Sequence, residues 1–277
     1  MPPTRGFSAG VMPTLRYWMR TDVHVFAFSV AANVLLSFYP FLIVMTWVAH
    51  KLFNYKTALA AVDTALHGFF PDAFSEFMTR NLPYTGNLQI ASLVLLLFTA
   101  NGVFEPLEVS LNHVWGVTKN RNFFHNQLIS LALIFVCGGL AIASLALTGM
   151  NHSTVEAMFG FGDWIPIIFF KLASVPVTIV ILFLIYYYVP NFRPPRNRVI
   201  AAAIVTGIVM EAVKALVLNK FVWEPIFRKL TNEYGVFKYS VSLILLAFFS
   251  SMLVLAGAEW AARGHRADEI KEEIKDA

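Results

Sequence analysis

The sequence predicts an all-α polytopic membrane protein, a bundle of six transmembrane helices with both termini in the cytoplasm. Composition is the first observation: hydrophobic residues make up 57% of the 277 residues and charged residues 14%, with a mean hydropathy of +0.63. Six apolar stretches are the second, since each can cross a hydrocarbon core of about 30 Å with about 20 helical residues. The distribution of Lys and Arg between these stretches is the third, because it sets the orientation.

These stretches divide the chain into a cytoplasmic tail (residues 1–25), one integral membrane domain (residues 26–262) and a charged cytoplasmic tail (residues 263–277). Each stretch is predicted to be helical because lipid offers the backbone N–H and C=O groups no other partner. The six spans are Phe26–Ala49, Leu88–Leu107, Leu128–Gly149, Ile165–Val189, Val199–Lys220 and Val241–Ala262.

The first span follows a tail that carries Arg5, Arg16 and Arg20. The apolar run after this tail is too long for the core of a signal peptide and lacks a small-residue cleavage site. We therefore expect it to remain as a span. Pro40 near its middle removes a backbone hydrogen bond, which predicts a bend.

The first external loop, residues 51–87, has the apolar residues Leu59, Val62 and Leu66 at helical spacing. This spacing predicts a helix that lies on the membrane surface, or one that packs as a lid on the outer ends of the spans. The sequence leaves both alternatives open.

The later spans differ in the polar residues that interrupt them. The second contains Asn101 and Glu105, and the fourth contains Lys171. The third contains Cys137, which is the single cysteine of the chain, so no internal disulfide is expected and a buried apolar role is favoured.

The fifth span carries two charges, Glu211 and Lys214, and the sixth ends near Glu259. The C-terminal stretch ADEIKEEIKDA is rich in charge and in helix-forming residues, which is typical of a solvated helix end.

Lys and Arg residues outside the spans fall unevenly on the two sides of the membrane. Twelve lie in the two tails and in the second and fourth loops, and seven lie on the other side. The positive-inside rule therefore places both termini in the cytoplasm. Because these basic residues flank spans and form no continuous stripe, we expect them to set topology and not to bind nucleic acid.

The sequence contains no motif that is typical of a hydrolase. Metal-dependent hydrolysis needs clustered His, Asp or Glu ligands, but the seven histidines are scattered over both sides of the membrane. A Gly-rich phosphate loop before a helix and a Gly-x-Ser-x-Gly elbow are both absent from the sequence. We therefore expect no catalytic residue, no metal and no cofactor.

Glu211 and Lys214 need compensation, because an ionisable group at the bilayer centre costs about 2.5 to 3.5 kcal/mol. They are three residues apart, so they can pair on one helix face and serve structure alone. The alternative is a polar groove between helices, in which the cations suit an anionic head group. The other polar residues that could line this groove are Lys171, Asn33, Asn101, Glu105 and Glu259.

Each of these other residues also has a structural explanation. Glu105 and Glu259 can lie at helix ends and reach the interface, as can Lys171 from within its span. Asn33 and Asn101 can bond to adjacent helices. The sequence does not decide between these explanations and a shared groove.

Several short motifs go beyond hydropathy. The first span contains ANVLLSFYPF, LNHVWGV follows the second span, YYYVPNF closes the fourth and LAGAEW ends the sixth. In the order and spacing of these motifs, the chain resembles the YihY/BrkB family of six-span bacterial inner-membrane proteins, whose early name was ribonuclease BN. The resemblance covers roughly residues 27–262. The positions that carry the resemblance are Ser37, Pro40, Asn112, Trp115, Gly116, Pro190, Asn191, Tyr234, Gly235, Gly257, Ala258 and Glu259.

The resemblance implies a location in the bacterial cytoplasmic membrane. From the cations of the groove we expect anionic membrane lipids as partners. The leading functional hypothesis is a non-enzymatic protein that moves or accommodates an anionic amphiphile along its polar interior. A structural or scaffolding protein of the cell envelope is the alternative, and a membrane-embedded hydrolase ranks third. A homo-oligomer is left open.

Overall fold

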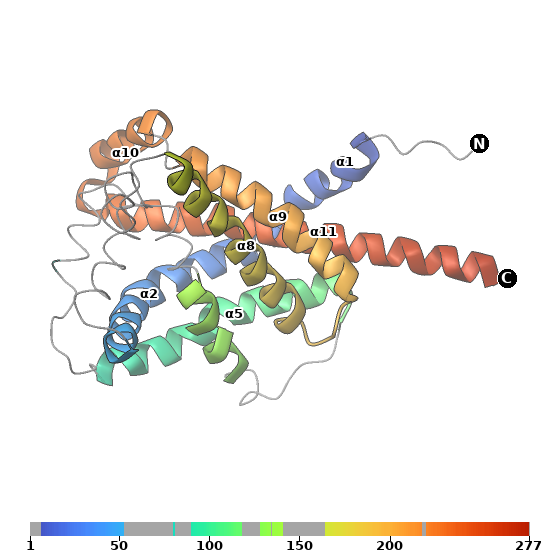
Figure 1. The fold of residues 1–277 in the computed structure, drawn as a ribbon, viewed down its shortest axis with the longest axis horizontal. Helices are drawn as coiled ribbons and strands as arrows, with labels where there is room; N and C mark the ends of the chain where they lie inside the picture. The colour runs from blue at the N-terminus through green and yellow to red at the C-terminus, as the bar shows by residue number, and fades with distance from the viewer. Residues whose placement is uncertain are drawn as a thin grey trace.

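The computed structural model describes residues 7–52, 80, 90–117, 128–133, 135–140, 164–217 and 220–276. This part of the chain is helical and contains no strand, which confirms the all-α prediction (Figure 1). Residues 128–133 and 135–140 are also helical. The named helices are α1 (Phe7–Trp18), α2 (Thr21–Leu52), α5 (Ile90–Trp115), α8 (Trp164–Tyr188), α9 (Arg196–Val217), α10 (Lys220–Tyr234), the 3-10 turn η1 (Gly235–Phe237) and α11 (Lys238–Asp276).

Five predicted spans coincide largely with α2, α5, α8, α9 and α11. The third predicted span is helical at 128–133 and 135–140, and its end at residues 141–149 lies outside the described part. Three helical stretches are long and apolar enough to cross a membrane within the described residues, namely Thr21–Val44, Arg196–Val217 and Phe221–Gly264. The count of six spans and the orientation of the termini stay predictions.

Two helices were absent from the sequence prediction. Helix α1 lies in the stretch expected to be a tail, and α10 lies in the stretch expected to be the fifth loop. Neither has a long apolar run, since both alternate apolar and polar residues around the helix. The last helix also continues beyond its predicted span at Ala262, so most of the charged tail belongs to α11.

Helix α11 runs along the molecule and joins two helix pairs. It packs against α2, which lies on α5, and against α9, which lies on α8 (Figure 1). A continuous core of buried apolar side chains connects these helices, with Val23, Leu111, Leu182, Val199 and Leu255 among its members. This arrangement places α8, α9 and α11 side by side, with consequences for Glu211 and Lys214.

Gly257 lets α11 approach α9 closely and leaves room for the Tyr186 side chain of α8. A methyl group on Gly257 would overlap the hydroxyl groups of Thr206 and Tyr186. The Tyr186 hydroxyl lies 2.8 Å from the Val254 carbonyl oxygen, to which it donates, and 3.3 Å from Thr206 Oγ1. Close backbone approach with hydrogen bonds between helices is typical of packing inside a membrane.

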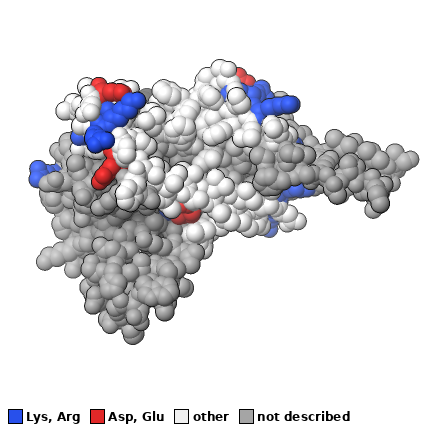
Figure 2. Space-filling view, turned by 90° about the horizontal axis from the view of Figure 1, so that it is seen from above, with Lys and Arg blue, Asp and Glu red and all other residues white. Residues whose placement is uncertain are grey.

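The surface of α9 fits a lipid environment. After Arg196 and Asn197 at its start, its exposed side chains are all aliphatic, and a contiguous apolar face of this kind marks contact with a partner or a membrane. One face of the molecule also carries few charges along its middle, and its Lys and Arg gather toward the ends (Figure 2). The large exposed aliphatic side chains of α9 are Ile200, Ile204, Val205, Ile208, Val209, Val213 and Leu216.

Candidate functional site

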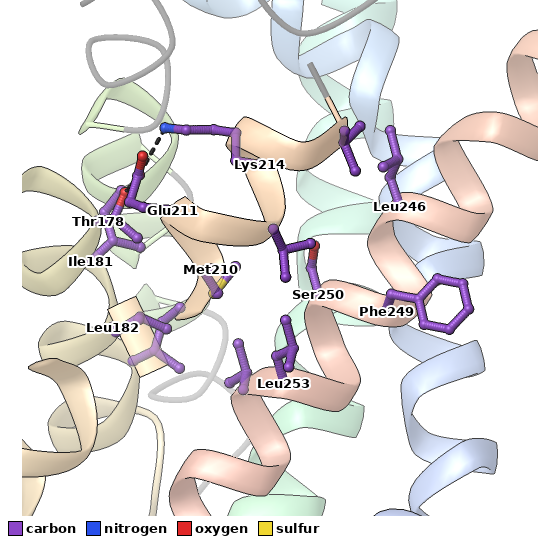
Figure 3. A pocket seen from close by; sticks show the side chains of 14 residues that line it. Thr178, Ile181, Leu182, Met210, Glu211, Lys214, Leu246, Phe249, Ser250 and Leu253 are labelled. Carbon is purple, nitrogen blue, oxygen red and sulfur yellow. Dashed lines mark hydrogen bonds and ion pairs between the residues drawn. The ribbon is translucent and has the colours of Figure 1, made fainter. Parts of the chain in front are cut away.

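Glu211 and Lys214 form an ion pair on α9. Lys214 Nζ donates to Glu211 Oε1 at 2.7 Å, and the two side chains are only 11% (Lys214) and 12% (Glu211) exposed. The hydroxyl of Thr178 on α8 donates to the same carboxylate oxygen (Figure 3). The pairing predicted from the three-residue spacing is therefore present, and Thr178 links it to a second helix.

This charged group borders a cavity of about 390 Å³ between α8, α9 and α11. The walls are mainly apolar, with Leu182, Met210, Leu246 and Leu253 among them (Figure 3). Lining groups that carry side-chain oxygen or nitrogen are Thr178, Glu211, Lys214 and Ser250. A concave apolar space with a few polar groups at its edge has the general chemistry of a small-ligand site.

The cavity reaches the apolar surface of the molecule. Val213 and Phe249 line it and are also 38% and 52% exposed. A hydrocarbon chain could therefore enter sideways from lipid without crossing a charged surface.

Two of the residues proposed for a polar groove are not described at the level of their side chains. Lys171 belongs to α8 and Asn101 to α5, and both side chains lie outside the described part of the structure. Their position relative to Glu211 and Lys214 stays a prediction.

Asn33 makes its hydrogen bond within α2. Its Nδ2 donates to the Ser29 carbonyl oxygen at 2.9 Å, and Ser37 Oγ donates to the Asn33 carbonyl oxygen at 2.8 Å. Pro40 follows inside the same helix and is buried. Side-chain bonds to the preceding turn are one way in which polar residues are accommodated inside a helix.

Glu259 belongs to a separate cluster that joins α1 to α11. Thr14 Oγ1 donates to Glu259 Oε2 at 3.0 Å, and Arg263 Nη2 donates to Thr14 Oγ1 at 2.8 Å. Arg263 Nε also lies 3.4 Å from Glu259 Oε1. Burial, and then the Glu259 charge, raises the pKa of Tyr17 on α1 to about 12.

The remaining acidic groove candidate, Glu105, is exposed on α5. One turn further along, Glu108 is only 7% exposed. The sequence reasoning did not single out Glu108, because it lies just past the predicted end of the second span.

Motif residues from the second and fourth loops meet at one end of α5. Asn112 Oδ1 accepts a hydrogen bond from the Asn191 backbone N–H at 2.8 Å, and the rings of Trp115 and Phe192 lie 5.8 Å apart. Gly116 has a φ of 70°, which favours glycine. Its N–H donates to the His113 carbonyl, and the next N–H donates to the Asn112 carbonyl, so the two bonds together cap α5.

Comparison with known proteins identifies the family of the chain. A family model described as Virulence factor BrkB matches residues 14–277. The chain belongs to the BrkB family.

Relatives of this BrkB-family chain are described as UPF0761 membrane proteins. Those of Xanthomonas campestris pv. campestris (strain B100) and Xanthomonas axonopodis pv. citri are each 26% identical over 245 residues. That of Xanthomonas oryzae pv. oryzae (strain PXO99A) is 26% identical over 242 residues. Each alignment covers 85% of this chain and 56% of the relative, so the chain spans about half of their length. No solved structure matches the chain.

Most of the described BrkB-family motif positions serve packing or turns. Asn112 and Trp115 hold the end of α5, capped at Gly116, against Asn191 and Phe192 in the turn after α8, where Pro190 is buried. Tyr234 and Gly235 form the turn between α10 and α11, where Gly235 has a φ of 54°. Gly257 and Ala258 lie where α11 packs against neighbouring helices, and the Ser37 hydroxyl donates a hydrogen bond within α2.

The groove candidates therefore fall into separate groups in this BrkB-family chain. Glu211 and Lys214 are brought together at the cavity, and Glu259 lies in the α1 cluster. Sequence reasoning missed Thr178, Ser250 and Thr14, since each contacts or faces partners far away in the chain. Arg263 had a usable signal, because it is four residues from Glu259. Within the described residues, no group of three His, Cys, Asp or Glu side chains could hold a metal ion.

Proposed function

We propose that this BrkB-family membrane protein accommodates a membrane lipid in the cavity between α8, α9 and α11, and moves it along that cavity. The observation that carries this proposal is the position of the buried Glu211–Lys214 pair at the edge of an apolar cavity of about 390 Å³. We place the protein in the bacterial cytoplasmic membrane with six spans and both termini inside.

The size and surface of the cavity support a hydrocarbon ligand. Small-ligand cavities are typically about 300 to 1,000 Å³ and mostly apolar. The walls here are mainly aliphatic, and Val213 and Phe249 connect them to the exposed apolar face. A membrane lipid already has its acyl chains in an apolar environment, so no water has to be removed from them when they enter the cavity from the bilayer.

The Lys214 ammonium group favours a ligand with an anionic head group. An ammonium group has three N–H donors, so Lys214 can serve a phosphate oxygen as well as Glu211. The neighbouring carboxylate compensates the ammonium before the ligand arrives, which lowers the cost of burying it. We therefore propose an anionic phospholipid as the ligand.

The test is lipid movement in reconstituted vesicles. Fluorescent phosphatidylglycerol and phosphatidylcholine are placed in both leaflets, and the fraction reached by an impermeant quencher is followed over time. We expect the protein to accelerate exchange of phosphatidylglycerol between leaflets. The double variant Glu211→Gln/Lys214→Met should lose this acceleration while it still inserts.

The matched control is Lys229→Met/Glu233→Gln, which removes an exposed Lys–Glu pair on α10, with Lys229 76% and Glu233 51% exposed. It should exchange lipid like the unchanged protein. Vesicles in which the unchanged protein accelerates neither lipid would contradict transport.

A structural role is the second candidate, because Glu211, Lys214 and Thr178 satisfy one another without a ligand. On this alternative the protein has no lipid exchange to lose, and the pair affects thermal stability alone. Measuring exchange and thermal stability on the same samples separates the two candidates.

We further propose that the protein is not an enzyme. Among the side chains that line the cavity, the Thr178 hydroxyl most resembles an activated nucleophile, because it donates a hydrogen bond to the Glu211 carboxylate. Products formed from phosphatidylglycerol by the protein in detergent, and lost in Thr178→Val, would contradict this proposal.

A further inference from the structure

The turn between α8 and α9 exposes two arginines among aromatic residues. Arg193 and Arg196 are both exposed, and Tyr188 and Phe192 beside them are 47% and 38% exposed. Exposed aromatic side chains next to basic ones are characteristic of the interface between membrane and water. Tyr187 is nine positions after Thr178 on α8, a rise of about 14 Å, so this turn is distinct from the Glu211–Lys214 pair beside Thr178.

The two guanidinium groups act on one neutral acceptor, the Tyr187 hydroxyl. Arg196 Nε donates to it at 3.4 Å, and the Arg196 guanidinium carbon lies 5.7 Å from the centre of the Tyr187 ring. Arg193 also interacts electrostatically with this hydroxyl. A phenol compensates neither charge.

Neither arginine has an acidic partner in the part of the chain that the structure describes. The described ion pairs involve Arg20, Lys214, Lys229 and Arg263 instead. Helix α9, which begins at Arg196, has no acidic residue in its first turn. Two positive charges are thus brought together, and no carboxylate among the described residues compensates them.

The backbone that carries these arginines is held in place. The Asn191 N–H donates to Asn112, and Phe192 lies against Trp115 on α5. Pro190 and Pro194 are both buried. The arginines therefore start from a defined turn, which reduces the ordering cost of binding a ligand.

We infer that Arg193 and Arg196 form a binding site for the phosphate group of an anionic phospholipid in the leaflet next to this turn. The planar guanidinium group matches phosphate oxygens with two parallel N–H donors, which a hydrated ammonium does not. Tyr188 and Phe192 favour a lipid over free phosphate, because they offer apolar surface beside the head group. This site stands independently of the proposed lipid movement through the cavity.

The experiment is native mass spectrometry of the purified full chain in detergent. Phosphatidylglycerol, phosphatidylcholine and sodium phosphate are titrated separately, and the bound fraction is counted. The double variant Arg193→Gln/Arg196→Gln should bind phosphatidylglycerol about tenfold more weakly, as expected for loss of charge-assisted hydrogen bonds. Its binding of phosphatidylcholine should be unchanged.

The control is Arg16→Gln/Arg228→Gln, which removes the same charge from two other exposed arginines. It should keep the phosphatidylglycerol affinity of the unchanged protein. A conservative variant, Arg193→Lys/Arg196→Lys, keeps the charge but removes the planar donors and should fall between the two.

Three results would overturn the inference. One is equal phosphatidylglycerol binding with and without the two arginines, and another is an equal loss in the control variant. The third is sodium phosphate displacing phosphatidylglycerol at equal concentration, because the site would then recognise free phosphate. Thermal unfolding of every variant shows that the comparison is made on folded protein.

Discussion

The pair of Glu211 and Lys214 shows how a charged residue can be tolerated inside an apolar helix. Each is almost buried, and each finds its counter-charge one turn away on α9. Thr178 adds a donor from α8, so the carboxylate is bonded across a helix interface as well. The spacing made the pair predictable, whereas the third partner depends on how α8 packs against α9.

Removing one partner of this pair should be worse than removing both. Lys214→Met leaves the Glu211 carboxylate buried without its cation, and breaking a buried pair costs about 3 kcal/mol. In the double variant Glu211→Gln/Lys214→Met no charge remains, so most of this loss should be recovered. The midpoint of unfolding in a denaturing detergent, followed by circular dichroism, measures both. Equal midpoints for the single and double variants would contradict the expectation.

Gly257 sets the distance between α11 and its neighbours. A larger side chain meets the hydroxyl groups of Thr206 and Tyr186, and overpacking of this kind costs about 1 to 3 kcal/mol. We expect Gly257→Val to lower the unfolding midpoint clearly and Gly257→Ala to lower it less. If Gly257→Val unfolds like the unchanged protein, the helices are not held at this distance by the glycine.

The position of α1 depends on a small polar cluster, besides the apolar contacts of Tyr17 and Trp18 with the core. Thr14 both donates to Glu259 and accepts from Arg263, so a single hydroxyl joins α1 to an ion pair on α11. The partners are 245 and 249 residues apart in the chain. A sequence pattern read locally could not have found this contact.

Thr14→Val should release α1 without disturbing α11. Valine has nearly the same shape but no hydroxyl, and hydrogen bonds to charged groups contribute about 1.5 to 3 kcal/mol. Hydrogen–deuterium exchange should rise in peptides from residues 7–18 and stay unchanged in peptides from residues 241–262. Arg16→Gln, at an exposed position of the same helix, should leave both unchanged. An unchanged exchange rate of α1 in Thr14→Val would show that its apolar contacts suffice.

Alkaline pH should weaken the same attachment. The pKa of Tyr17 is raised from 10.0 to about 12, mainly by burial, so the docked helix favours the neutral phenol. Its contribution is complete below pH 10 and is lost as the pH rises from 10 toward 12. Exchange of α1 measured at pH 9 and pH 11, corrected for the intrinsic rate, should show this loss. Tyr17→Phe, which has no phenol to ionise, should remove the part of the change that Tyr17 causes.

The helices differ in how readily the sequence revealed them. The apolar stretches that became α2, α8, α9 and α11 were found because each is long and carries few charges. Helices α1 and α10 were missed because their polar residues break the apolar run, although such residues are compatible with a helix at an interface. Hydropathy therefore located most described core helices, and amphipathic helices required the structure.

For the molecule as a whole, the sequence predicted the chemistry of single residues better than their grouping. It identified Glu211 and Lys214 as residues that need compensation inside a membrane, and Glu259 as a further groove candidate. It placed them in one hypothetical groove, whereas the structure has Glu211 and Lys214 at the α8–α9–α11 cavity and Glu259 under α1. Grouping depends on helix rotation and on long-range packing, and neither is encoded in the distance of a residue from the membrane surface.

The orientation of the whole bundle gives the last prediction. If six spans cross the membrane and both termini are inside, Asn197 at the start of α9 lies in the cytoplasm and Asn232 on α10 lies outside, and both positions are exposed. Cys137 is the single cysteine and is buried, so Cys137→Ala gives a background for new cysteines. An impermeant maleimide added to intact cells should label Asn232→Cys and should label Asn197→Cys only after the membrane is opened. Labelling of Asn197→Cys alone in intact cells would mean that the orientation is reversed. Labelling of both would mean that α9 does not cross the bilayer, and the lipid-facing position of its cavity would then lose its physical basis.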